Sequence, residues 1–253
     1  MSNAEAKTVI VNFLNLTSDY LNGGHVRPRD DLELTPVNEA SPALPLAYLI
    51  EEESPPSLES LYAEIAVCKN CGLAEKRLNT VPGEGSVCPM VMVIGEGPGQ
   101  DEDRTGRPFV GRAGQLLDKM LDSIGLSRNT NCYIANIVKC RPPGNRDPAP
   151  DETAACFPYL HQQILQLQPQ IILCAGRAAA QIILKTSQGI NALRGEITEL
   201  TIDETTIPVL CTFHPSALLR NESLKRPAWE DLKLLKSWLD SRRGQGIQTP
   251  PLE

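Results

Sequence analysis

The chain has 253 residues, enough to bury a full core, and its 4% of aromatic residues predicts that this core is mostly aliphatic. The formal net charge of -7 comes entirely from residues 1–60, which hold three basic and ten acidic residues. The rest of the chain holds 21 of each, so the overall charge does not exclude binding to DNA.

The sequence has no apolar run long enough to cross a bilayer and no signal peptide at its amino end. We therefore expect a soluble cytoplasmic protein without membrane contact, and a monomer. Eight cysteines in such a protein are more typical of metal ligands and buried thiols than of disulfides.

Residues 1–56 are acidic and interrupted by prolines, which predicts a flexible N-terminal extension. The pattern changes at residue 57, and we expect one domain over residues 57–241. Residues 242–253 are expected to form a flexible C-terminal tail.

Helices and strands alternate along this domain. Apolar residues at helical spacing predict helices over residues 58–66, 113–124, 150–167, 177–184 and 229–239. Short branched apolar runs predict strands over residues 91–94, 133–138, 171–175 and 209–213, and a small hairpin over residues 197–202 and 207–208. This order predicts an α/β fold, a three-layer sandwich in which helices flank a central four-stranded parallel sheet.

Each predicted core strand ends in glycines or in residues that carry chemistry. These ends are residues 95–97, 139–141, 176–177 and 214–215. The carboxyl ends of parallel strands share one edge of a sheet, so a single composite site is expected there. Carboxylates follow the glycines of residues 95–97. The alternative interpretation of this stretch is an acidic surface turn that belongs to no site.

Four cysteines stand in polar or helix-start surroundings that suit ligands: Cys68 and Cys71 in a C-x2-C pair, with Cys140 and Cys156 to complete the set. Four thiolates fit either zinc or an iron-sulfur cluster, and the spacing does not choose between them. Four unconnected thiols remain the alternative. The other cysteines are interpreted as ordinary buried thiols: Cys88, Cys132, Cys174 and Cys211.

Four motifs occur in order along the chain: GEGPG at residues 95–99, GRPFVGRAG at 106–114, NIVKCRPP at 136–143 and HPSALLR at 214–220. Together they resemble the family 4 uracil-DNA glycosylases, the iron-sulfur members of that superfamily. The resemblance covers residues 57–239 and includes the four ligand cysteines. It implies a 4Fe-4S cluster in place of zinc, and a monofunctional enzyme that hydrolyses the glycosidic bond of uracil in single- or double-stranded DNA.

A related branch of the superfamily bonds covalently to uracil-DNA and carries a basic, histidine-containing insertion after its first motif. Here Gly99 is followed by residues 100–104 with no histidine, so the chain resembles the enzymes that turn over.

The resemblance also implies roles for single residues once uracil has been flipped out of the helix. The uracil pocket includes Glu96, Gly97, Pro98, Phe109, Asn136 and His214. Phe109 stacks on the base, and the amide of Asn136 matches the O4 and N3 edge of uracil. His214 stabilises the negative charge that develops on the departing base.

Water activation is the least defined step. Superfamily members that have an aspartate in the first motif use it to orient the water, and Gly97 stands at that position here. Glu102 is the favoured water partner, Glu96 is expected mainly to shape the pocket, and Asn145 is a further candidate.

The segment after His214 is expected to contact DNA. Leu218 or Leu219 would fill the gap left by the flipped base. Arginines suited to phosphate contact are Arg220, Arg141 and Arg146.

Three other functions stay open at this level. The missing first-motif aspartate allows a non-catalytic iron-sulfur or zinc DNA-binding module of the same fold. A glycosylase of broader base range is a second alternative, although Asn136 argues for uracil. A nucleotide-binding protein is the third, but the glycine motif lacks the lysine and hydroxyl residues of a P-loop.

Overall fold

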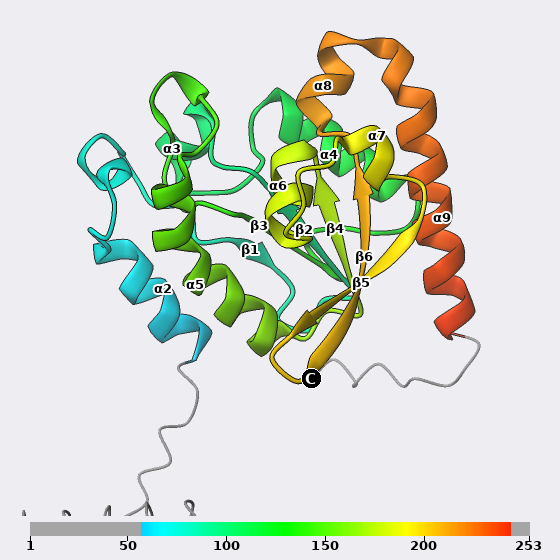
Figure 1. Cartoon of the computed structure of the whole chain (residues 1–253), viewed down its shortest axis with the longest axis horizontal. Helices are drawn as coiled ribbons and strands as arrows, with labels where there is room; N and C mark the ends of the chain where they lie inside the picture. The colour runs from blue at the N-terminus through cyan, green and yellow to red at the C-terminus, as the bar shows by residue number, and fades with distance from the viewer. Residues whose placement is uncertain (1–56, 244–253) are drawn as a thin grey trace, which may run out of the picture. The chain divides into compact units, whose positions relative to one another are not determined.

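The computed structural model describes residues 57–243, which fold around one mixed sheet (Figure 1). Its six strands lie in the order β1-β3-β2-β4-β6-β5. They are β1 (Glu84–Gly85), β2 (Val91–Gly95), β3 (Cys132–Asn136), β4 (Ile171–Ala175), β5 (Ile197–Ile202) and β6 (Thr205–Thr212). The predicted four-stranded parallel centre is confirmed, because β3, β2, β4 and β6 run parallel, and β1 and β5 add an antiparallel strand at each edge.

Helices cover both faces of this sheet, as the three-layer prediction requires (Figure 1). The α-helices are α2 (Leu58–Val67), α3 (Gln100–Thr105), α4 (Arg112–Asp122), α5 (Pro150–Leu167), α6 (Arg177–Ile183), α7 (Ile190–Leu193), α8 (Pro215–Arg220) and α9 (Lys225–Arg243). Short 3-10 turns are η3 (Gly72–Glu75), η4 (Pro143–Asn145) and η5 (Glu222–Leu224).

The alternation of side chains along β2 shows how the two cores form. Met92 and Ile94 face a cluster that includes Leu160 of α5, whereas Val91 and Val93 face a cluster that includes Leu121 of α4. All four β2 side chains are fully buried, since successive residues of a strand point to opposite faces and helices cover both. The continuous apolar run seen in the sequence follows from this double coverage.

The predicted boundary between residues 208 and 209 was wrong. The predicted hairpin arm at residues 207–208 and the predicted core strand at 209–213 are one strand, β6, which passes through Pro208. Proline lacks an N–H, but β4 pairs with β6 only from Val209 onward, so Pro208 has a neighbour on one side alone and the sheet tolerates it.

The short helices α3, α7 and α8 were not predicted, because four to six residues are too few to show an apolar period.

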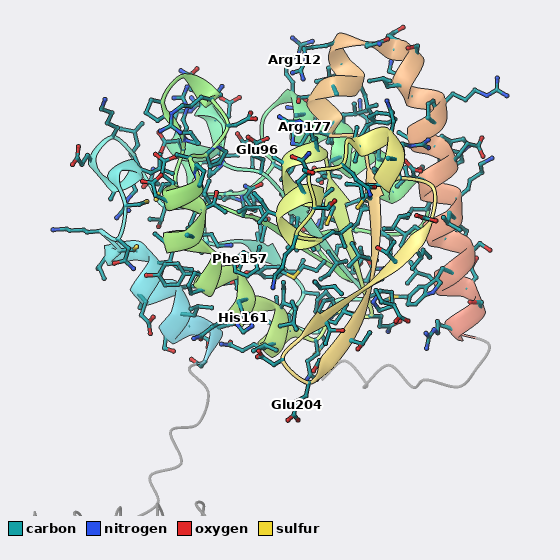
Figure 2. The ribbon with its side chains drawn as sticks, in the orientation of Figure 1. Glu96, Arg112, Phe157, His161, Arg177 and Glu204 are labelled. Atoms are coloured by element: carbon teal, nitrogen blue, oxygen red, sulfur yellow. The ribbon has the colours of Figure 1, made fainter. Side chains whose placement is uncertain are left out.

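The carboxyl ends of the parallel strands meet at one edge, as expected. Gly95 pairs in register with Asn136, and Ala175 pairs with Thr212, two residues before His214. Figure 2 places Glu96 and Arg177 at this edge, and Glu204 at the opposite end of the sheet, in the β5–β6 turn.

No helix within residues 57–243 is long and apolar enough to span a membrane. The predicted extension at residues 1–56 lies outside the described residues, as does the predicted tail from residue 244 onward. The helix α9 runs on to Arg243, so the domain boundary predicted after residue 241 falls inside a helix.

Candidate active site

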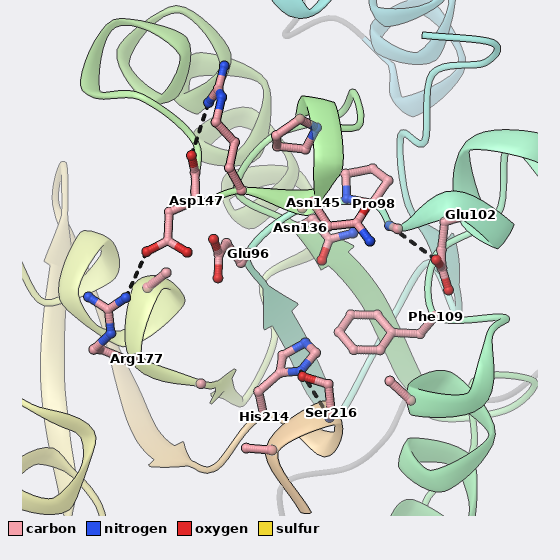
Figure 3. A pocket seen from close by; sticks show the side chains of 18 of the residues that line it. Glu96, Pro98, Glu102, Phe109, Asn136, Asn145, Asp147, Arg177, His214 and Ser216 are labelled. Atoms are coloured by element: carbon pink, nitrogen blue, oxygen red, sulfur yellow. Dashed lines mark hydrogen bonds and ion pairs between the residues drawn. The ribbon is translucent and has the colours of Figure 1, made fainter. Parts of the chain in front are cut away.

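A pocket opens at the edge where the parallel strands end (Figure 3). The loops after β2, β3, β4 and β6 form its walls, together with the segment before α4. The predicted uracil-binding residues all line it, namely Glu96, Gly97, Pro98, Phe109, Asn136 and His214, and so do Glu102, Asn145, Arg146 and Arg220. The structure thus brings together residues that lie up to 124 positions apart in the sequence.

Asn136 ends β3 and is only 1% exposed. The residue lines the pocket, and its buried Oδ1 has no hydrogen-bond partner among the described residues. Leaving a buried acceptor unpaired costs about 1–3 kcal/mol, so this atom calls for a ligand with a hydrogen-bond donor. The adjacent strand keeps the space open with Gly95, where an added Cβ would lie 2.4 Å from Asn136 Oδ1.

Phe109 is held in a left-handed backbone conformation, with a φ of 51°. A bulky residue adopts this conformation only when its surroundings enforce it, at a cost of about 1–3 kcal/mol. Arg128 Nη2 donates to the Phe109 carbonyl at 2.7 Å, and Glu102 Oε1 accepts from the amide of Val110 at 2.8 Å. The Phe109 ring centroid lies 5.6 Å from that of His214, so the two rings face the same part of the pocket.

Gly114, in the first turn of α4, allows this strained loop to pack closely on the helix. An added Cβ at Gly114 would lie 1.8 Å from the carbonyl oxygen of Phe109. Because that contact involves backbone atoms, no side-chain rotation could relieve it.

His214 follows β6 and forms the N-cap of α8. The backbone amide of Ser216 donates to His214 Nδ1 at 3.1 Å, so Nδ1 is an acceptor and the ring proton lies on Nε2. Burial lowers the pKa of His214 to about 4, and nearby Arg220 acts in the same direction. At neutral pH the ring is therefore a neutral imidazole that offers one N–H donor to the pocket.

Glu102 lines the pocket, but its carboxylate is already committed to the backbone. Oε2 accepts from the amide of Gly99 at 3.1 Å, and Oε1 accepts from the amides of Val110 and Gly111 at 2.8 and 2.9 Å. The bond to the Gly99 amide caps the start of α3, and the bonds to Val110 and Gly111 tie that helix to the Phe109 loop. They favour a bracing role for Glu102 over the predicted role as water partner.

Glu96 follows β2, and its carboxyl group faces the pocket beside Asp147 (Figure 3). Burial raises the pKa of Glu96 to about 7, and the negative charge of Asp147 and a hydrogen bond with it add to this rise. Arg177 at the start of α6 acts in the opposite direction and pairs with Asp147 at 2.7 Å. Glu96 is therefore a carboxyl group that titrates near neutral pH, which suits general-base chemistry.

One of the predicted DNA contacts was wrong. Leu218 is 2% exposed and packs in the core beneath α8, because it faces α4 and α9. Its neighbour Leu219 is 41% exposed, so of the two leucines it is the one whose side chain is accessible to a partner. Arg220 is exposed at the pocket mouth, but Arg146 pairs with Glu152 at 2.6 Å, and Arg141 donates to Asn145 Oδ1 at 2.8 Å.

The four predicted ligand cysteines come together from three segments. Cys68 ends α2, Cys71 precedes η3, Cys140 follows β3 and Cys156 lies in α5. All four line one small cavity that is otherwise walled mainly by apolar atoms. Of the four cysteines interpreted as buried thiols, three are buried and Cys88 is exposed, because it lies in the loop before β2.

The donor set of this cysteine cavity, four thiols, fits an iron-sulfur cluster, and zinc accepts the same set. Two sulfurs also accept hydrogen bonds, from Arg77 to Cys140 at 3.3 Å and from the amide of Lys139 to Cys156 at 3.2 Å. Such bonds stabilise thiolates, which are the form that binds a cluster.

A buried lysine connects the cysteine cavity to the pocket. Lys139 is 1% exposed, and its ammonium donates to the carbonyl of Asn136 at 2.9 Å and to Gln163 Oε1 at 2.7 Å. Gln163 in turn donates to Tyr133 OH and to the carbonyl of Pro82. This network fixes the end of β3, which presents Asn136.

Sequence reasoning missed Asp147, Arg177, Arg128 and Ser216. Asp147 follows the predicted phosphate contact Arg146, and Arg177 belongs to the predicted strand end at residues 176–177. No role was predicted for either, and nothing in the spacing shows that they pair. Arg128 lies 19 residues from Phe109 and reads as a surface charge, yet it is 8% exposed. Ser216 stands in the HPS motif, and its helix-start position was the available sign that it contacts His214.

Comparisons with known proteins agree with this geometry. The family model described as the uracil DNA glycosylase superfamily matches residues 82–233. The chain is 43% identical over 185 residues to a type-4 uracil-DNA glycosylase of Sulfurisphaera tokodaii, covering 71% of this chain and 84% of that protein. It is 42% identical over 185 residues to the type-4 uracil-DNA glycosylase of Thermotoga maritima, covering 72% of this chain and 94% of that protein.

Proposed function

Because the chain belongs to the uracil DNA glycosylase superfamily, we propose that it hydrolyses the N-glycosidic bond of uracil in DNA and leaves an abasic site. The enzyme acts in base excision repair of deaminated cytosine. Its substrate is DNA, and we expect the uracil to be accepted from single or double strands by a monomer.

The observation that carries this proposal is the unpartnered Oδ1 of Asn136. Uracil has an N–H at N3 that would satisfy this acceptor, and its O4 would accept from the amide nitrogen of the same side chain. Cytosine has a bare acceptor at N3 and an amino group at position 4, so it would leave Oδ1 facing a lone pair. Uracil is distinguished from cytosine mainly by the penalty on cytosine. Leaving a buried hydrogen-bonding group unpaired costs more free energy than forming the bond gains.

Phe109 supplies a stacking surface next to this edge. A base inside a duplex cannot reach the pocket, so the nucleotide must rotate out of the helix first. The clamps from Arg128 and Glu102 hold the Phe109 backbone before the base arrives, which lowers the entropy cost of binding. Gly97 and Pro98 complete the wall with backbone and ring atoms.

Bond cleavage makes the sugar positive and the uracil negative. The Nε2–H of His214 donates to O2 of the departing base, and one well-placed donor of this kind contributes about 3–4 kcal/mol. A water molecule attacks C1′ as the C1′–N1 bond breaks, with the bonding pair leaving on uracil. We assign the water proton to the carboxylate of Glu96, because the oxygens of Glu102 are engaged by backbone amides.

Cys68, Cys71, Cys140 and Cys156 would hold a 4Fe-4S cluster. When bound, the cluster supplies a rigid cross-link between α2, the loop after β3 and α5. Leu219 fills the space vacated by the flipped base, and Arg220 contacts phosphate, with Arg141 and Arg146 as further phosphate contacts once their present partners release them.

The test uses the full chain purified without added metal. Its visible absorption is recorded, and it is then incubated in EDTA with oligonucleotides that carry one uracil, either opposite guanine or in a single strand. Alkali cleaves the strand wherever a base has been released. Matched oligonucleotides with thymine, cytosine or hypoxanthine in place of uracil are the controls.

A brown protein that yields alkali-labile strands from uracil alone is the expected result. A protein that binds the DNA but leaves every uracil in place would overturn the catalytic proposal and support a non-catalytic module of the same fold. Release of hypoxanthine would replace uracil specificity with a broader base range. A colourless protein containing zinc would overturn the cluster assignment.

A further inference from the structure

Three charged side chains from three different strand ends meet at one side of the pocket (Figure 3). Glu96 follows β2, Asp147 lies in the loop between β3 and α5, and Arg177 follows β4. Arg177 Nη2 donates to Asp147 Oδ2 at 2.7 Å, and the Glu96 carboxyl group lies beside the Asp147 carboxylate (Figure 3). Two adjacent carboxyl groups can form a hydrogen bond with each other only when one of them carries a proton.

We infer that Asp147, held by Arg177, is a positioning residue that shares a proton with Glu96 and so sets the pH at which Glu96 can accept a proton from water. The inference rests on the proposed function, in which Glu96 is the base. The guanidinium of Arg177 occupies one side of Asp147, which places the shared proton on Glu96. The shared proton orients the Glu96 carboxyl group toward Asp147. Glu96 becomes negatively charged only when that proton leaves.

Three other ionisable groups that line the pocket have partners or are neutral. Arg146, next to Asp147, pairs with Glu152, and Glu102 accepts from backbone amides. The ring of His214 is neutral at physiological pH, because burial lowers its pKa to about 4. Arg220 also lines the pocket, from α8, and its charge acts on His214. Asp147 and Arg177 are therefore the paired charges that lie on the same side of the pocket as Glu96 (Figure 3).

The two neighbours must act in opposite directions. Burial and Asp147 raise the pKa of Glu96 to about 7, while Arg177 lowers it. In D147N the negative neighbour is lost, so Glu96 ionises at lower pH and the acidic limb of the rate profile moves to lower pH. In R177Q the positive neighbour is lost, so the same limb moves to higher pH. Each shift should be about one pH unit, the size expected for one charge a few ångström away in a partly solvated site.

The experiment measures single-turnover uracil release from about pH 5 to about pH 9 for the full chain, D147N and R177Q. Both side chains are more than half exposed, at 65% and 55%, so the substitutions leave the core intact. The matched control is D240N, which removes an exposed carboxylate paired with Lys236 on α9, away from the pocket, and should leave the profile unchanged. Salt should reduce both shifts, because exposed charges are screened.

A second readout does not depend on activity. The 13C resonance of the Glu96 carboxyl, assigned with E96Q, is titrated in the full chain and in both variants. Opposite displacements of that titration support the inference. Unchanged titrations, or displacements in the same direction, overturn it even when uracil is released. A full chain that releases no uracil overturns the proposed function, while the titration still decides whether Asp147 and Glu96 share a proton.

Discussion

Two buried polar sites lie near the end of β6, and they differ in how completely their atoms are paired. In the first, the fully buried Asp231 of α9 accepts from Arg194 Nε and Nη2 at 3.0 and 2.7 Å and from Thr212 Oγ1 at 2.7 Å. In the second, the pocket, Asn136 Oδ1 has no partner among the described residues. In the first site the Asp231 carboxylate has its hydrogen-bond donors within the chain. In the second site Asn136 Oδ1 would obtain a donor only from a ligand.

The backbone shows the same contrast. Arg194 and Asp231 lie in ordinary conformations, while the pocket contains Phe109 at a φ of 51° and Gly176 at a φ of 102°. An added Cβ at Gly176 would lie 2.8 Å from His214 Cβ. In the pocket the strained Phe109 backbone and the unpaired Asn136 Oδ1 occur together, whereas the paired site supplies stability.

The largest effect is expected from breaking the paired site with D231A. The substitution leaves the Arg194 guanidinium, which is 19% exposed, without its carboxylate. Removing one partner of a buried ion pair costs about 3–5 kcal/mol, so urea unfolding should show a loss of that size. The control is D240A, which removes an exposed partner of Lys236 on the same helix and should cost about 1 kcal/mol or less. Equal losses in the two variants would contradict the comparison.

The next largest effect is expected on the rate of uracil release. H214L removes the Nε2–H donor, and uracil release should slow by about 10²- to 10³-fold in single-turnover assays. Leucine fills the space of the ring but removes the cap on the Ser216 amide, so urea unfolding should show a loss of about 0.5–2 kcal/mol. S216A removes the Oγ that contacts His214 Nδ1 at 2.8 Å but keeps the backbone amide that donates to the same atom, so it should slow release less than H214L does. A wild-type rate for H214L would remove His214 from the catalytic assignment.

N136A should separate binding from stability. It removes both hydrogen bonds proposed for the uracil edge, and release should fall about 10- to 100-fold. Stability, measured by urea unfolding, should stay equal or rise, because the native Oδ1 is unpartnered before the ligand binds. A marked loss of stability would mean that the Asn136 side chain stabilises the fold without a ligand, as Asp231 does. Q163A provides the contrast, since Gln163 is fully buried and hydrogen bonded, and should destabilise the fold.

The smallest effect is expected from deleting residues 1–56. The pocket and the cysteine cavity both lie within residues 57–243, so uracil release by the truncated chain should match that of the full chain. Circular dichroism would show whether the truncated chain folds. Loss of activity from a folded truncation would show that the extension takes part in catalysis or DNA binding.

Much of the fold follows from local patterns. The parallel centre of the sheet was predictable because strands 91–94 and 171–175 are continuous apolar runs between helical segments. The helix over residues 150–167 was predicted to its exact bounds, since Pro150, two acidic residues and an apolar period mark its start. The antiparallel edge β1 was missed because two residues carry no pattern.

The motifs of the sequence determined which segments build the pocket, since chemistry at the ends of parallel strands must converge on one edge. They also determined the four cysteines that line one cavity. Tertiary structure alone decided which carboxylate is free: Glu102 is bound by amides eight and nine residues away, whereas Glu96 meets Asp147 and Arg177 from other strands. It also buried Leu218 and exposed Leu219. Pairing, burial and charge depend on neighbours that are distant in the chain, so no local pattern can report them.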